Sequence, residues 1–232
     1  MKSKKRKEKR KDHIKLVDIS KLRFAIELEV EFPETKDSEA LIGRHRVLNG
    51  WEIDYDGSLE NGAEYRPKNK NKLYYNEESL LQIKEILALI RVHGGKISRR
   101  CGLHIHIDCT KFTNKQILEI IKEFIIKQKY IVKRFNIDKE RLEETCKLLP
   151  RDNLQKLTVT DIRKFRKESD WSFNCYSYLD EKYYSLNASH LRKEDYGTLE
   201  FRLFDATTSY RKIKEQIHWV IGFVRDCLER EQ

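Results

Sequence analysis

The sequence lacks the features that mark secreted, disulfide-linked and membrane-spanning proteins. It contains five cysteines, an odd number with no CxxC pair among them, so reduced thiols are the simpler interpretation. No hydrophobic run approaches the roughly 20 residues that cross a bilayer, and no apolar signal-peptide region follows the basic N-terminus. We therefore expect a soluble, cytoplasmic protein with no membrane contact.

Positive charge is concentrated near the N-terminus. The chain has a net charge of +10, and residues 1–15 alone contain nine Lys or Arg against two acidic residues. The simpler interpretation is a solvated, disordered tail, and a weak contact with nucleic acid through this tail is the alternative. The remaining length suits one sizeable domain and is too short for two large ones. We predict a basic tail over residues 1–18 and one folded domain over residues 19–232.

Three segments alternate between apolar and polar residues, as β-strands with one polar face do. They span residues 24–32, 101–109 and 198–204. Their polar positions are occupied by Glu27, Glu29, Glu31, His104, His106, Asp108, Thr198, Glu200 and Arg202. Between the first two segments, the dipeptides Asp56-Gly57 and Asn61-Gly62 favour tight turns, so residues 51–67 predict a hairpin or two short strands.

Helical spacing of apolar residues accounts for most of the remaining chain. Four helical segments are predicted: residues 76–93, Thr113 towards Phe135, residues 138–170 and residues 213–224. Gly94-Gly95 supplies a stop after the first of them. Thr113 and Gln116 form the pattern of a capping box at the start of the second.

Each polar strand face has an ordinary explanation when it is taken alone. A row of glutamates on an antiparallel strand can face solvent, and His104 and His106 can be half-buried strand residues. A zinc site that adds Cys101 and Cys109 is weaker, because Cys101 lies on the opposite strand face from both histidines. Recurrence on several strands favours a shared site, since gathered carboxylates need bound cations to offset their repulsion. Magnesium or manganese suits oxygen ligands with one imidazole.

Five motifs occur in an order that resembles the amidoligase family. They are A-I-E-L-E at residues 25–29, D-G-S at 56–58 followed by E-Y-R-P at 64–67, G-L-H-I-H at 102–106, K-Y-Y-S-L-N at 182–187 and T-L-E-F-R-L-F at 198–204. Each motif alone is weak, but five in one order are specific, and together they cover about residues 23–222. The family is grouped with glutamine synthetase and glutamate–cysteine ligase. The resemblance implies an α+β fold, in which a curved antiparallel sheet carries a metal and nucleotide site on one face and packs helices on the other.

The resemblance also implies roles for single residues. The implied metal ligands are Glu27, Glu29, Glu64, His104 and Glu200. Arg202 resembles the arginine that contacts the transferred phosphoryl group, a role that suits its fork of donors. Asp56 resembles the carboxylate that positions or deprotonates the attacking amine. Tyr183 and Asn187 resemble a pair near the substrate or nucleotide.

Several motif positions have no implied role or depart from the family pattern. His106 and Ser58 belong to the motifs without a role that the resemblance assigns. Arg66 replaces a frequent Ser, and Lys182 replaces a frequent Arg. Both departures concern the substrate pocket rather than the metal ligands. Ala25 replaces a frequent Gly on a strand, where the change matters little.

The activity that the resemblance implies is an ATP-dependent carboxylate–amine ligase. ATP with Mg²⁺ or Mn²⁺ would phosphorylate a small-molecule or peptide carboxylate, and an amine would attack the resulting acyl-phosphate to form an amide. One alternative is a guanidino-kinase-like phosphotransferase, because guanidino kinases share the same general sheet. Another is a catalytically inert nucleic-acid-binding protein that uses its basic tail. The intact acidic and imidazole residues of the motifs favour the ligase.

Overall fold

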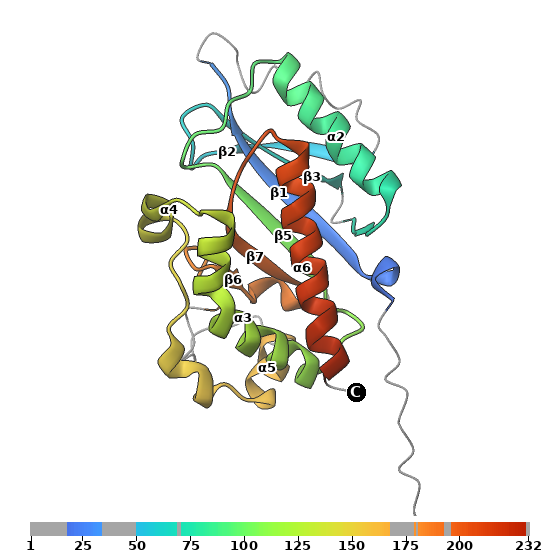
Figure 1. Cartoon of the computed structure of the whole chain (residues 1–232), viewed down its shortest axis with the longest axis vertical. Coiled ribbons are helices and arrows are strands. Elements are labelled where there is room, and N and C mark those ends of the chain that lie inside the picture. Colours follow the sequence, from blue (N-terminus) through green and yellow to red (C-terminus); the bar gives the residue numbers. More distant parts are fainter. Residues whose placement is uncertain are drawn as a thin grey trace, which may run out of the picture.

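Figure 1 shows the computed structural model of the chain, which describes residues 18–33, 50–68, 71–167, 179, 181–192 and 196–230. The predicted tail lies outside these ranges except for Asp18, and so do Cys175 and the end of the predicted 138–170 segment. Across the described part of the chain, no helix combines the length and the apolar character needed to cross a membrane.

An open, antiparallel sheet of seven strands forms the centre of the molecule. Its strands are β1 (Arg23–Glu31), β2 (Trp51–Asp56), β3 (Gly62–Pro67), β4 (Leu73–Tyr74), β5 (Gly102–Asp108), β6 (Leu186–Asn187) and β7 (Thr198–Asp205). They lie in the order β2-β3-β1-β5-β7-β6, and β4 pairs with the start of β1. The three predicted alternating strands, now β1, β5 and β7, are therefore neighbours, and the predicted hairpin is the β2–β3 pair.

Alternation along the strands gives the sheet two chemically different faces. The apolar face contains Leu28, Leu103 and Phe201, each of which is fully buried. All seven positions of β5 are buried, so its polar face is covered as well. Part of that cover is the chain around β6 and β7, where the rings of His190 and Tyr196 lie beside the polar face of β5. The polar face is therefore covered over β5, whereas polar positions on β1 and β3 remain partly exposed.

Three long helices cover the apolar face of the sheet (Figure 1): α2 (Glu77–Val92), α3 (Asn114–Phe135) and α6 (Tyr210–Arg230). Phe201 of β7 packs against Phe124 of α3 and Phe223 of α6, with ring centroids 5.4 and 6.1 Å apart. The predicted capping box at Thr113 is present. α2 ends at His93, and Gly94 adopts a φ of 76°, a left-handed value that glycine accepts readily. The α+β class is confirmed.

The helical prediction for residues 138–170 is confirmed only in part. The described residues form α4 (Lys139–Glu144), the 3₁₀ helix η4 (Arg151–Lys156) and α5 (Val159–Phe165). Pro150 stands between the first two, and its fixed φ and missing N–H prevent one continuous helix. Two more 3₁₀ turns, η1 (Ile19–Lys21) and η6 (Ser189–Leu191), flank the sheet strands.

Candidate active site

The strand register gathers the predicted ligands on one face of the sheet. At three places it sets acidic or imidazole residues opposite one another: Glu64 with Glu29, Glu27 with His104, and His106 with Glu200. Directly opposite residues point to the same face of a sheet. The alternation that was visible in each strand therefore becomes one continuous row of carboxylates and imidazoles across β3, β1, β5 and β7.

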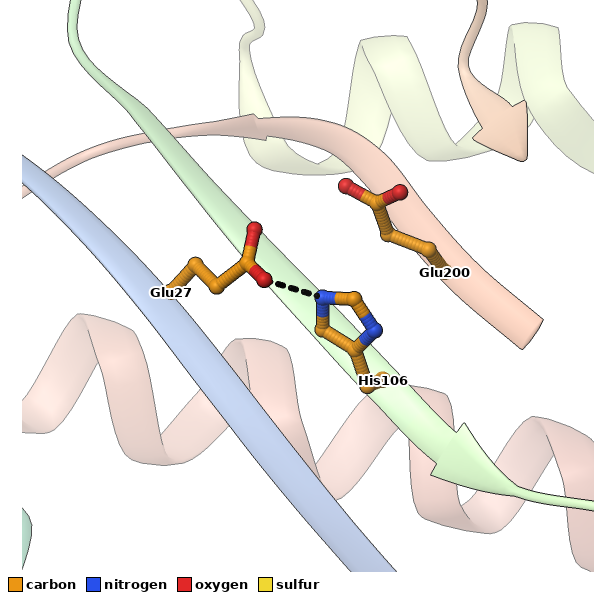
Figure 2. Close-up of side chains that lie close together, drawn as sticks. All are labelled: Glu27, His106 and Glu200. Atoms are coloured by element: carbon orange, nitrogen blue, oxygen red, sulfur yellow. Dashed lines mark ion pairs between the residues drawn. The ribbon is translucent and has the colours of Figure 1, made fainter. Parts of the chain in front are cut away.

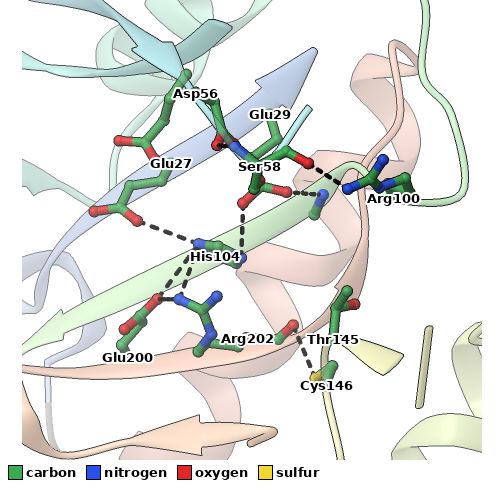
Figure 3. A network of polar contacts seen from close by, with 12 residues as sticks. Glu27, Glu29, Asp56, Ser58, Arg100, His104, Thr145, Cys146, Glu200 and Arg202 are labelled. Carbon is green, nitrogen blue, oxygen red and sulfur yellow. Dashed lines mark hydrogen bonds and ion pairs between the residues drawn. The ribbon is translucent and has the colours of Figure 1, made fainter. Parts of the chain in front are cut away.

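His104 lies at the centre of this row and is 2% exposed (Figure 3). Its Nδ1 is 3.2 Å from Oε2 of Glu27 and 3.3 Å from Oε1 of Glu200. Its Nε2 is 3.5 Å from Oε1 of Glu29. The second carboxylate oxygen of Glu29 accepts a hydrogen bond from the backbone N–H of Gly102 at 2.5 Å, which fixes its orientation. One imidazole thus joins carboxylates from two different strands.

His106 forms a second contact with the carboxylate of Glu27 (Figure 2). Its Nε2 lies 3.1 Å from Oε1 of Glu27, and its Nδ1 lies 3.1 Å from the hydroxyl of Thr198. One ligand atom from each of Glu27, His106 and Glu200 lies within 4.8 Å of the others, a spacing that can hold a metal ion. The Thr198 contact fixes the ring through one nitrogen and leaves the other to face the acids, as supporting groups do for metal-binding histidines.

Burial and charge shift the proton affinities of these acids in opposite directions. Burial alone would raise the pKa of Glu27, but His106 and His104 together hold that pKa well below its usual value. Burial raises the pKa of Glu64 to about 8, and the charge of Glu27 adds to this rise while Arg66 opposes it. With a pKa of about 8, Glu64 is mostly protonated at neutral pH when no cation is bound.

Arg202 reaches this row from β7. Its Nη1 donates to Oε1 of Glu200 at 2.5 Å and lies 3.4 Å from Nδ1 of His104. Burial opposes the charged form of Arg202, but Glu200 outweighs that effect and raises the pKa of the guanidinium. Glu200 is 1% exposed, and its Oε2 has no hydrogen-bond partner among the described residues, although Nε2 of His190 lies 3.7 Å away. A buried carboxylate oxygen in this state is suited to a cation.

These side chains open into a pocket of about 220 Å³. Seven of the nine residues singled out from the sequence line it: Glu27, Glu29, Asp56, Glu64, His104, Tyr183 and Arg202. Glu200 lies behind the lining and reaches it through His104 and Arg202. Asn187 lies opposite Glu200 in the register, but it is buried and its Oδ1 accepts from the backbone N–H of Ser189. Its place near the substrate or nucleotide stays a prediction.

A family model described as "Putative amidoligase enzyme" matches residues 15–224. The chain belongs to this amidoligase family. The match extends beyond both ends of the segment that the five motifs delimit. A search of curated proteins gives no match. The family therefore supports an enzyme that forms carbon–nitrogen bonds, and the details of substrate and cofactor depend on the site itself.

Basic residues, two of them outside the five motifs, also line the pocket. Arg100 and Arg141 line it together with Lys182 of the fourth motif. Nη2 of Arg100 donates to the backbone carbonyl of Ser58 at 2.5 Å (Figure 3), which ties the β2–β3 turn to the start of β5. Nη2 of Arg141 donates to the backbone carbonyl of Arg202 at 3.1 Å. The alternation that identified the strand residues could not identify Arg100 or Arg141, because Arg100 lies in a loop and Arg141 lies on the short helix α4.

The departures from the family pattern have defined places in this amidoligase. Arg66 contacts the carboxylates of Glu52, Asp54 and Glu64, with Nη1 lying 3.5 Å from Oε1 of Glu64. It therefore supplies positive charge beside the acidic row. Nζ of Lys182 lies 5.3 Å from the centre of the Tyr183 ring, and both line the pocket, as does Ser58.

The zinc alternative with cysteine ligands gains no support from these contacts. The thiol of Cys109 donates to the backbone carbonyl of Ile107 at 3.3 Å, and the sulfur of Cys101 lies 3.5 Å from the hydroxyl of Ser98. Neither belongs to the group with Glu27 and Glu200 that can hold a metal. Carboxylate oxygens with one or two imidazoles instead suit Mg²⁺ or Mn²⁺, with manganese the better match to nitrogen.

Proposed function

We propose that this amidoligase uses ATP and a divalent cation to join a carboxylate to an amine through an acyl-phosphate. The observation that carries the proposal is the row of Glu64, Glu29, Glu27 and Glu200 beside buried imidazoles, with Arg202 at its edge. Carboxylates so placed suit cations that carry a polyphosphate, because without them the acids would repel it. We further infer that the sheet is of the glutamine synthetase type and that the enzyme works in the cytoplasm, where its free thiols stay reduced.

The residues present fit a bound Mg²⁺ or Mn²⁺. Glu27, Glu29, Glu64 and Glu200 offer oxygen ligands, and His104 is the imidazole that the motif assigns, with His106 as a second candidate from the geometry. Bound there, the cation would neutralise charge on the phosphates of ATP. The protonated state of Glu64 in the metal-free protein means that cation binding also releases a proton from the site.

Arg202 is the group that we assign to the moving phosphoryl. Glu200 fixes one arm of its guanidinium at 2.5 Å, and the side chain lines the pocket. A fixed fork of donors can stabilise charge that develops on phosphoryl oxygens without reorganising during the reaction. The contact with Glu200 makes the position of Arg202 depend on the same carboxylate that we assign to the cation.

Asp56 is the group that we assign to the amine. It lines the pocket at the end of β2, where its Oδ1 accepts from the backbone N–H of Ser58 at 2.8 Å. That hydrogen bond holds one oxygen and leaves the other to accept a proton from an ammonium substrate. Tyr183 lies at the mouth of the pocket, 48% exposed, where it can contact either substrate.

The test is a screen of amino acids and short peptides, in pools, for phosphate release from ATP with Mg²⁺ or Mn²⁺. Hydroxylamine is then added, since it captures an acyl-phosphate as a hydroxamate, and the Asp56→Asn variant should retain capture while losing amide formation. A product that carries a stable phosphate on a guanidino group would overturn the proposal in favour of a phosphotransferase. Phosphate release without hydroxamate from any active pool would remove the acyl-phosphate step.

A further inference from the structure

A second depression lies on the far side of the sheet from the candidate active site, between the outer surfaces of α3 and α6. It has a volume of about 510 Å³. Its lining consists of Lys127, Tyr130, His218, Trp219, Gly222, Phe223 and Asp226. The two helices face the viewer in Figure 1, where α6 passes in front of the sheet. We call this depression the α3–α6 groove.

Contacts between the helices define the direction and the ends of the groove. Glu123 of α3 contacts Arg230 of α6 at 3.2 Å, and Arg134 contacts Glu215 at 3.7 Å. The start of α3 therefore lies beside the end of α6, and the end of α3 lies beside the start of α6, so the two helices are antiparallel. The groove lies between residues of the two helices that these ion pairs join, and three of its seven lining residues are aromatic: Tyr130, Trp219 and Phe223.

Gly222 leaves a notch in the lining of the groove, because it has no side chain. It lies in the interior of α6, where glycine is less favourable than alanine. A Cβ added at this position would meet no atom within 4 Å. Packing inside the chain therefore does not require a glycine here. A backbone that approaches from outside would require one.

Apolar surface surrounds this notch. The rings of Trp219 and Phe223 are stacked, with centroids 5.2 Å apart and planes 5° apart, and Nζ of Lys127 lies 5.7 Å from the Phe223 ring. Tyr130 is 56% exposed and Ile126, one turn away, is 47% exposed. Phe223 itself is buried, at 5% exposed, and Trp219 is partly exposed, so most of the exposed surface here comes from Tyr130 and Ile126. Exposed aromatic and apolar groups that border a notch are typical of an interaction surface.

We propose that the α3–α6 groove is an interface with a second copy of this chain, in which α6 crosses α6 of the partner at Gly222. A two-fold axis that sets the two copies of α6 antiparallel at that crossing makes positions equally far before and after Gly222 face each other. His218, four residues before, then faces Asp226, four residues after, and Trp219 faces Arg225. The first pair joins an imidazole to a carboxylate, and the second places a guanidinium over an indole.

Within the chain, Nε and Nη2 of Arg225 donate to Oδ1 of Asp226 at 2.9 and 2.6 Å, so Oδ2 is the oxygen of Asp226 that can meet the other copy. The hydroxyl of Tyr75 holds Nδ1 of His218 at 2.6 Å, so Nε2 is the nitrogen that can meet a carboxylate of the other copy. Helices that pack at an angle of about 50° diverge within two turns of the crossing. Like charges farther along α6 therefore stay apart, and charge complementarity is needed only near Gly222.

The experiment measures self-association of the full chain by sedimentation velocity from about 1 to 200 µM. We expect a monomer–dimer equilibrium. Gly222→Leu fills the notch and should raise the dimer dissociation constant at least tenfold. The matched control is Ala88→Leu, which adds a leucine side chain at an exposed position of α2 and should leave the constant unchanged. Circular dichroism of both variants confirms that the fold is intact.

A charge exchange tests the geometry of the crossing independently of packing at the notch. Asp226→Lys removes the partner of His218 and should weaken the dimer, and adding His218→Glu should restore it, since the opposite charges then face each other in reversed order. A wild-type protein that stays monomeric at the highest concentration overturns the proposal. So does a dimer that Gly222→Leu leaves intact, or a weakened dimer that the exchange fails to restore.

Discussion

The raised pKa of Glu64 can be tested directly, because it makes the stability of the fold depend on pH. Its pKa is raised to about 8 by burial and by the charge of Glu27. An unfolded chain would ionise the same carboxyl at its ordinary value of 4.5. Between these two values the folded protein binds the proton that the unfolded chain has released, so stability falls as pH rises through this window and is level above it.

The expected magnitude follows from the width of that window. One proton held across about three pH units, from pH 5 to pH 8, corresponds to about 4 kcal/mol. The side chain of Glu64 is 19% exposed and Arg66 lies 3.5 Å away, so we expect about 2–4 kcal/mol of the unfolding free energy to depend on this group. Glu64→Gln removes the titrating group, and its stability should change less over the same range.

The assay is urea unfolding of the metal-free protein, with chelator present, at pH 5 and pH 8. Wild type should lose stability relative to Glu64→Gln as the pH rises, and the matched control Glu78→Gln, at an exposed position of α2, should follow wild type. Parallel pH profiles for wild type and Glu64→Gln would refute the reasoning. The added stability from Mn²⁺ should also be larger at pH 8, since at pH 5 the cation must displace the proton of Glu64.

Four further predictions address the proposed chemistry. ATP should bind with Mg²⁺ or Mn²⁺ and not with chelator, and equal calorimetric affinities in both conditions would contradict a shared cation. Glu200→Gln should lower Mn²⁺ affinity about 10- to 100-fold, whereas Arg202→Lys should keep Mn²⁺ and ATP binding but lower turnover about 10²- to 10³-fold. His106→Gln should weaken Mn²⁺ binding measured by electron paramagnetic resonance without ATP, and unchanged binding would leave His104 as the imidazole ligand. Deleting residues 1–15 should preserve folding and nucleotide binding and reduce any salt-sensitive affinity for RNA or DNA, and a loss of nucleotide binding would place the tail in the site.

The alternation of apolar and polar residues predicted which side chains share a strand face, but it did not predict how the strands are ordered in the sheet. In β1, β5 and β7 the period of two assigned Glu27, His104 and Glu200 to one face each, because successive side chains on a strand point to opposite sides. It could not show that these three strands are neighbours. Strand order depends on long-range pairing, and the sequence indicated only that the strands share a site, through the recurrence of polar faces and the motif resemblance.

Other elements left no periodic signal. β4 and β6 have two residues each, too few for a recognisable alternation. Arg100 and Arg141 reach the pocket through hydrogen bonds to backbone carbonyls, and any residue type can supply such a carbonyl. The residue types at the accepting positions, Ser58 and Arg202, therefore do not indicate that these hydrogen bonds form. Asn187 belongs to a motif, and its Oδ1 accepts a local hydrogen bond that the motif did not indicate.

The complete burial of β5 has a consequence for how the protein unfolds. A strand that is buried at every position and paired on both sides has amide protons that exchange with solvent only when the whole domain unfolds. His104 and His106 both belong to that strand, so their surroundings cannot be dismantled by a local fluctuation. In hydrogen exchange, the amides of residues 103–107 should be among the last to exchange. Cation binding and backbone order should then disappear together in denaturant, within a single transition.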